Sequence, residues 1–333
     1  MMEYEVFKEI VKEQFLSYMP DDFANHTVNV HSVMKVNQSV DKLELIPPKG
    51  SGGGAIPSLS IKGMYEDYMQ NGNLRDVLSI SAFEYVRAYK NAPRNVEEQV
   101  LNNIKDKIVM MLINTEQNRE LLADTPHREF QDLSIVYRVV VRKDENGIHS
   151  ALVRNEYAEQ MGFDEQALYN AAVQNTKRLF PPVIKGMSQV MKEMFMKEGM
   201  PEELAELYIG TMSKNELMYV ITNEYGMNGA VSMLYEEGLH ELSKKLGSDL
   251  YIMPSSIHES IAISADSRNP YELAEMVRDI NMGEVELGER LSNQVYHYDK
   301  DLRKLSLATD TPNKRLDGIV TFVNPVVEKK VVR

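Results

Sequence analysis

The segment Glu216–Ser264 constrains the fold most, because its apolar residues change from strand-like to helical spacing and back again. Leu217–Thr222 is a short apolar run. Asn228-Gly229 follows it, and this dipeptide tolerates the positive φ angles of a tight turn. The sequence therefore predicts a β-hairpin whose second strand is Ala230–Leu234.

A helix is predicted directly after this hairpin. Its apolar positions recur at helical spacing, at Leu239, Leu242 and Leu246. Gly247 can then end the helix in the left-handed conformation that glycine adopts without strain. Two further strands are predicted at Leu250–Met253 and Ile257–Ile263, so the chain returns to a sheet after the helix.

A similar pattern occurs earlier in the chain. Leu133–Val141 is strand-like, Asn146-Gly147 predicts a turn, and Ile148–Val153 predicts the returning strand. Aligning the two turns in the sequence matches identical residues: Gly147 with Gly229, Ser150 with Ser232, and Leu152 with Leu234. Two explanations remain open, a duplicated hairpin-helix unit or the independent recurrence of a common motif.

These patterns predict an α+β fold, in which an antiparallel sheet built from β-hairpins is covered by amphipathic helices. Ala92-Pro93-Arg94-Asn95 is the best candidate for a boundary, because proline and polar residues interrupt both helices and strands. We therefore expect a smaller N-terminal α+β lobe (1–94), a main α+β domain (95–302) and a partly flexible C-terminal tail (303–333).

Composition excludes several classes of protein. The chain has 333 residues and a formal net charge of −13, which opposes general binding to nucleic acid. It has no cysteine, so disulfides, thiolate catalysis and cysteine-ligated zinc are excluded. No apolar run approaches the roughly 20 residues that span a bilayer, and the first residues do not resemble a signal peptide. A cytoplasmic location without membrane contact is the expectation.

The stretch Pro254–Glu259 combines two hydroxyls, an imidazole and a carboxylate, and its candidate catalytic residues are Ser255, Ser256, His258 and Glu259. On a strand Ser256 and His258 share one side and Glu259 points to the other. A hydrolase would therefore take its orienting acid from elsewhere, with Asp132 or Glu224 as candidates. The structural alternative is a turn held by a hydrogen-bonded histidine.

A methionine-rich helix is predicted between residues 183 and 195. Met187, Met191 and Met194 lie on one helical stripe, and flexible thioether side chains suit an adaptable protein-binding groove. The alternative is a helix that packs this stripe on the core. No cofactor and no metal site are predicted, because the histidines are scattered singly without ligand spacing.

Several phrases carry a resemblance to a known family: DLSIVYR (132–138), NTKRLFP (175–181), GAVSMLYEEGLHEL (229–242), GSDLYIMPSSIHE (247–259) and ERLSNQVYHYD (289–299). The chain resembles a family of uncharacterised proteins from anaerobic gut bacteria, a domain of unknown function, over roughly its last two thirds. This resemblance implies no activity and no site residues.

The function predicted from the sequence is therefore that of a non-catalytic binding or regulatory protein whose partner is another protein. The alternative is a hydrolase with a Ser/His site at Ser256 and His258. The sequence leaves the oligomeric state open.

Overall fold

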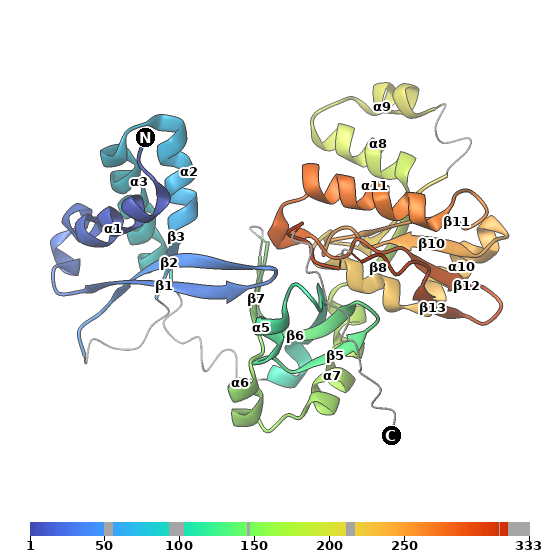
Figure 1. Cartoon of the computed structure of the whole chain (residues 1–333), viewed down its shortest axis with the longest axis horizontal. Helices are drawn as coiled ribbons and strands as arrows, with labels where there is room; N and C mark the ends of the chain where they lie inside the picture. The colour runs from blue at the N-terminus through green and yellow to red at the C-terminus, as the bar shows by residue number, and fades with distance from the viewer. Residues whose placement is uncertain (50–55, 93–102, 145–146, 211–216, 313, 319–333) are drawn as a thin grey trace, which may run out of the picture.

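A computed structural model describes residues 1–49, 56–92, 103–144, 147–210, 217–312 and 314–318 (Figure 1). In this part of the chain three antiparallel sheets are accompanied by helices, which confirms the α+β class. The predicted boundary at residue 94 and the strand-like run 319–323 lie outside the described residues. The division into two domains and a tail stays a prediction.

The N-terminal lobe contains a small sheet with the order β1-β2-β3 and three helices. Its elements are α1 (Tyr4–Gln14), β1 (Thr27–Lys35), β2 (Gln38–Ile46), β3 (Ser58–Ser60), α2 (Ile61–Asn71) and α3 (Leu74–Asn91). Asn73 begins α3 by accepting hydrogen bonds from the N–H groups of Arg75 and Asp76. Phe7, Phe15 and other buried side chains form a separate hydrophobic core in this lobe.

The middle sheet has the strand order β4-β6-β5, and β7 pairs with β6. Its elements are β4 (Ile108–Asn114), α5 (Arg119–Leu122), β5 (His127–Phe130), β6 (Leu133–Asp144), β7 (Gly147–Leu152), α6 (Asn155–Gln160) and α7 (Glu165–Leu179). β4 is buried along its whole length and lies against α7. The predicted hairpin is confirmed, because β6 and β7 pair from Asp144–Gly147 to Arg138–Leu152.

The third sheet has six strands in the order β13-β12-β10-β11-β9-β8. Its strands are β8 (Pro182–Gly186), β9 (Tyr219–Asn223), β10 (Leu250–Met253), β11 (Ser260–Ser264), β12 (Tyr296–Asp299) and β13 (Lys304–Leu307). Its helices are α8 (Met187–Lys197), α9 (Glu202–Ile209), α10 (Glu236–Leu246) and α11 (Pro270–Gly283). The predicted helix before Gly247 is confirmed as α10, and Gly247 ends it with a φ of 70°.

The hairpin predicted at Asn228-Gly229 is wrong. Gly229–Leu234 forms a buried 3-10 helix, η5, and β9 pairs instead with β8 and β11. A Cβ at Gly229 would lie 2.2 Å from Thr222 Oγ1 and 2.6 Å from the carbonyl oxygen of His258. Glycine is therefore present because the main chain passes close to β9, rather than because a turn joins two strands.

The corrected structure also affects the duplication and the last predicted strand. Gly147–Leu152 is a strand whereas Gly229–Leu234 is helical, so a duplicated hairpin-helix unit is not confirmed. The strand predicted at Ile257–Ile263 begins only at Ser260, as β11. Before it, the chain makes one isolated bridge between Ser256 and Arg290.

The β1–β2 hairpin of the N-terminal lobe contacts both larger sheets through Asn37, which has a φ of 64° and is 3% exposed. The Asn37 N–H donates to Asn118 Oδ1 (2.6 Å), and Asn118 Nδ2 donates to Asn37 Oδ1 (2.7 Å). Asn37 Nδ2 donates to the carbonyl oxygens of Leu287 (2.8 Å) and Arg290 (2.7 Å). One asparagine therefore links three parts of the fold.

Candidate functional site on the six-stranded sheet

The stretch Pro254–Glu259 connects β10 to β11, and its hydrogen bonds separate Ser256 from the imidazole of His258. Ser256 Oγ accepts a bond from the main-chain N–H of His258 (3.0 Å). The imidazole Nδ1 of His258 accepts a bond from the N–H of Asn228 (3.2 Å), and Nε2 lies 3.5 Å from Glu289 Oε1. Both ring nitrogens therefore face groups other than the Ser256 hydroxyl.

The remaining catalytic candidates do not complete a Ser/His site. Ser255 is half-buried, and Glu259 and Glu224 are exposed. Asp132 accepts hydrogen bonds from Ser292 Oγ (2.6 Å) and from the hydroxyl of Tyr296. The sequence reasoning missed Glu289 as the acid beside His258, since no spacing signal connects the two. The hydrolase stays a prediction without supporting geometry.

The pKa of the Asp132 carboxyl group is shifted from its ordinary value. Burial raises its pKa, and the hydrogen bonds from Ser292 and Tyr296 oppose that effect by stabilising the charged form. Burial also raises the pKa of the Tyr296 phenol. These hydrogen bonds join Asp132, directly before β6, to Tyr296 of β12.

Helices α8 and α9 form a helical hairpin that follows β8. Lys192 of α8 joins them, because its ammonium group lies 2.8 Å from Glu202 and 2.7 Å from Glu206. The rings of Phe195 and Tyr208 also contact each other, with centroids 6.3 Å apart. In Figure 1, α9 lies outside α8, on the side away from the six-stranded sheet.

The predicted methionine stripe is only partly covered by the core. Met187 and Met191 are half-buried, and Met194 is 48% exposed. Met187 begins α8, where its N–H donates to the carbonyl oxygen of Met218 beside β9 (2.9 Å). The structure therefore places Met187 beside the sheet, leaves Met191 half-buried and directs Met194 toward solvent.

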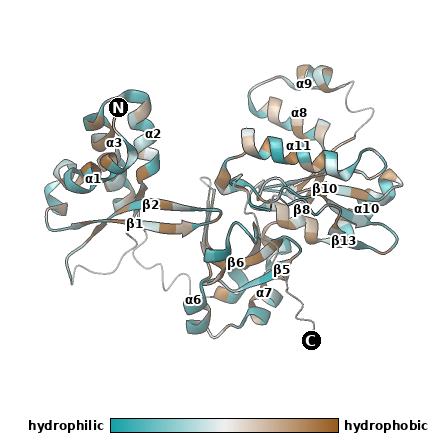
Figure 2. Cartoon of the chain, in the orientation of Figure 1, coloured by the Kyte–Doolittle hydropathy of each residue, from teal (hydrophilic) through white to brown (hydrophobic). Residues whose placement is uncertain are grey.

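Helix α9 carries a wide apolar face that is only partly covered. Ala205 and Ile209 are buried, while Leu204 and, one turn later, Leu207 and Tyr208 are exposed. We call these three residues the α9 face; Leu207 is 76% and Tyr208 67% exposed. Figure 2 shows the apolar and polar residues of α8 and α9. The sequence predicted this helix but assigned its exposed residues no role.

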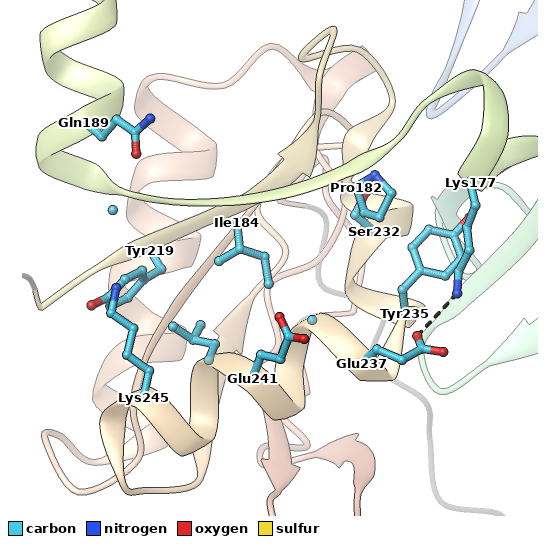
Figure 3. Close-up of a pocket in the computed structure, with 13 residues that line it drawn as sticks. Lys177, Pro182, Ile184, Gln189, Tyr219, Ser232, Tyr235, Glu237, Glu241 and Lys245 are labelled. Carbon is cyan, nitrogen blue, oxygen red and sulfur yellow. Dashed lines mark hydrogen bonds and ion pairs between the residues drawn. The ribbon is translucent and has the colours of Figure 1, made fainter.

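A cleft of about 650 Å³ lies between β8 and α10 (Figure 3), and we call it the edge cleft. Pro182, Ile184 and Gly186 of β8 form one wall. Gly238, Leu242 and three charged residues of α10 form the other, while the rest of its lining comes from neighbouring elements: Lys177, Gln189, Tyr219, Ser232 and Tyr235. These residues come from five separate stretches of chain, so no local sequence pattern predicted the cleft.

The charges of the edge cleft differ in how they are paired. Lys177 Nζ lies 3.3 Å from Glu237 Oε2, and it also lies over the ring of Tyr235, 4.7 Å from the centroid. A main-chain hydrogen bond and Lys177 together lower the pKa of Glu237. Lys245 lies over the ring of Tyr219 at 4.9 Å. The side chain of Glu241, within α10, forms no ion pair or hydrogen bond with another described residue.

The described residues contain no group of three or more histidine, aspartate or glutamate side chains that could hold a metal ion. Among them there is also no helix with both the length and the apolar character needed to cross a membrane.

Comparison with known proteins gives one match. The model of a family of unknown function (DUF5688) matches residues 4–300. No curated protein and no solved structure matches the chain. The predicted membership of a domain family of unknown function is thus confirmed. The match begins in the N-terminal lobe and ends at residue 300, so it does not confirm the predicted extent over the last two thirds. An origin in anaerobic gut bacteria stays a prediction.

Proposed function

The chain belongs to DUF5688, a family of unknown function, so its surface is the guide to its role. We propose that it is a non-catalytic protein that binds another protein through the α9 face. The observation that carries this proposal is the exposure of Leu204, Leu207 and Tyr208 on a helix that already buries Ala205 and Ile209. The apolar stripe of a surface helix normally faces the core. Large apolar side chains that extend such a stripe into solvent are typical of a binding surface.

The position of α9 supports the same proposal. The helix contacts the rest of the molecule mainly through α8, and Lys192 fixes the two helices together through Glu202 and Glu206. The α9 face is therefore presented on a preformed support, which reduces the entropy lost on binding. Met194 of the predicted methionine stripe is exposed on the adjacent helix.

The charges around the α9 face indicate the chemistry of the partner. Helix α9 contains three glutamates, of which Glu202 and Glu206 share Lys192, and Glu203 forms no ion pair with a described residue. The whole chain also has an excess of acidic residues. We therefore expect a partner with an apolar groove and a basic rim. A cytoplasmic location and the lack of a nucleic-acid partner remain predictions from the sequence.

The test compares two leucines with the same exposure. Leu207 is 76% exposed on the α9 face, and Leu302 is 75% exposed in the turn between β12 and β13. Immobilised wild type, Leu207→Glu and Leu302→Glu proteins are incubated with a lysate of the source cells, and bound proteins are quantified by mass spectrometry. Neither substitution should change stability by more than about 0.5 kcal/mol, since both side chains are solvated.

We expect at least one protein to be retained by wild type and by Leu302→Glu, and the amount retained by Leu207→Glu to be about thirtyfold lower. This factor corresponds to the loss of a central apolar contact of about 2 kcal/mol. Met194→Glu should reduce the same protein. Equal retention on all variants would show that the α9 face is not the binding surface. Concentration-dependent self-association abolished by Leu207→Glu would instead identify a second copy of the chain as the partner.

A further inference from the structure

Strand β8 is an edge of the six-stranded sheet, and no described strand pairs with its outer side. On its inner side, the Glu224 N–H donates to the carbonyl oxygen of Pro181 (3.1 Å), and the Met187 N–H donates to that of Met218 (2.9 Å). These bonds fix which residues of β8 face β9, because alternate residues of an antiparallel strand direct their polar groups to opposite sides. Ile184 therefore directs its N–H and C=O groups outward, and Gly186 directs its N–H outward, while the C=O of Gly186, the residue before α8, accepts the first hydrogen bond of that helix.

The same residues line the edge cleft. Pro182, Ile184 and Gly186 form its β8 wall, and Ile184 reaches α10, where its Cδ1 would lie 3.1 Å from a Cβ built on Gly238. Pro182 has no N–H, so the outer side offers two donors, on Ile184 and Gly186, and two free acceptors, on Pro182 and Ile184. The unpaired main-chain groups of β8 therefore belong to residues that line the edge cleft.

A buried hydroxyl provides a second, independent indication of a ligand. Ser232 lines the cleft, is 3% exposed, and its Oγ has no hydrogen-bond partner among the described residues. A buried hydroxyl without a partner costs free energy, and a polar group of a bound molecule would supply that partner. Figure 3 shows Ser232 beside Pro182, at the end of the cleft where Lys177 and Glu237 pair.

The spacing of charges on α10 matches that of an extended chain. Glu237, Glu241 and Lys245 follow at intervals of four residues, or about 6 Å along a helix. Alternate residues of a strand lie about 6.8 Å apart. Figure 3 shows that α10 runs in the same direction as β8, with Glu237 toward Pro182 and Lys245 toward the Gln189 end. Glu237 is already paired, whereas Glu241 and Lys245 have no ionic partner among the described residues.

We propose that the edge cleft binds an extended peptide, which adds to β8 as an antiparallel strand and places an acidic side chain beside Lys245 and, two residues later, a basic one beside Glu241. The basic residue lies opposite Ile184, exchanges two main-chain hydrogen bonds with it, and points toward α10 on the same face as the Ile184 side chain. The acidic residue lies opposite Gly186 and accepts a main-chain hydrogen bond from the Gly186 N–H. This site is separate from the α9 face and does not depend on it.

The probe is the capped peptide TEVKT carrying a fluorescent label, titrated with the full chain by fluorescence anisotropy. We expect saturable binding, and binding about tenfold weaker for the swapped peptide TKVET, because two favourable charge pairs become repulsive. The double variant Glu241→Lys, Lys245→Glu keeps the same charges in exchanged positions. It should reverse the preference between the two peptides.

Two methylated peptides test the strand addition itself. A methyl group on the amide nitrogen of the probe's lysine removes the hydrogen bond to Ile184, and should abolish binding. A methyl group on the amide nitrogen of the probe's valine points away from β8, and should leave the affinity within about twofold of that of the unmethylated probe. Both peptides have the same composition and leave the protein unchanged.

The proposal is overturned by any of three results: no saturable binding at millimolar protein, equal affinity of the two methylated peptides, or a charge preference unchanged in the double variant. Dimerisation of the chain that competes with the probe and is lost in the double variant would also overturn it, because a second copy would then occupy the edge. Failure of the α9 face test would not affect these outcomes.

Discussion

Replacing Asn37 by glycine should release the N-terminal lobe from both larger sheets. Glycine keeps the left-handed main chain of this turn, where φ is 64°, so the substitution removes only the side chain. The two main-chain bonds, to Asn118 Oδ1 and from Gln117 Nε2, can remain. Three side-chain bonds are lost, which involve Leu287, Arg290 and Asn118.

The size of the effect follows from these three bonds. Each contributes about 1 kcal/mol net when its partners are buried, so local docking should weaken by about 3 kcal/mol. Because every 1.4 kcal/mol is a factor of ten, the hairpin should open about a hundred times more often. The carbonyl oxygens of Leu287 and Arg290 both lose the donor that Asn37 supplies. The docking free energy should fall by less than this only if a water molecule takes the place of the amide.

Hydrogen exchange measures this opening without assuming that the whole chain unfolds in one step. Segments 33–40 and 287–291 should exchange about a hundredfold faster in Asn37→Gly. Asn103→Gly is the matched control, because Asn103 also has a positive φ (56°) but is exposed and caps no helix with its side chain. Equal exchange in the two variants would refute the linking role of Asn37.

Three other predictions concern single groups. A hydrogen bond from Arg303 holds the pKa of Glu236 at about 2, below the ordinary 4.5. This pair therefore stabilises the fold above pH 4.5, and the stabilisation is lost as the pH falls toward 2. NMR titration of Arg303→Gln should show the pKa of Glu236 returning toward 4.5. Tyr296→Phe removes the donor of a buried tyrosine from the half-buried carboxyl of Asp132 and should lower the free energy of unfolding by about 2 kcal/mol, measured with urea, whereas an unchanged midpoint contradicts the role assigned to this pair. A serine-reactive phosphonate should leave Ser256 unlabelled, because His258 does not face its hydroxyl, and labelling would revive the hydrolase.

The sequence predicted those elements whose signals are local. Helix α10 combines leucines at helical spacing with a glycine that ends it, and the β6–β7 hairpin combines strand-like runs with Asn146-Gly147. The same dipeptide at Asn228-Gly229 gave the wrong prediction. There the conformation is decided by the close approach of Thr222 and His258, which belong to other parts of the sheet.

The candidate sites could be predicted only in part for the same reason. Periodicity predicted α8 and the helix up to Ile209, but it cannot show which apolar face remains uncovered after packing. Exposure of Leu207 is a property of the assembled α8–α9 hairpin. The edge cleft depends on which strand is outermost, and strand order in the sheet does not follow order in the sequence.

Photo-crosslinking from single introduced cysteines tests the binding role of the α9 face most directly. The chain contains no cysteine, so Leu207→Cys and Leu302→Cys each carry one benzophenone label at a known place. After irradiation in a lysate of the source cells, the label at 207 should give a specific crosslinked partner, rich in basic residues at the contact, and the label at 302 should not. The same products from both positions, or none from 207, would contradict the account.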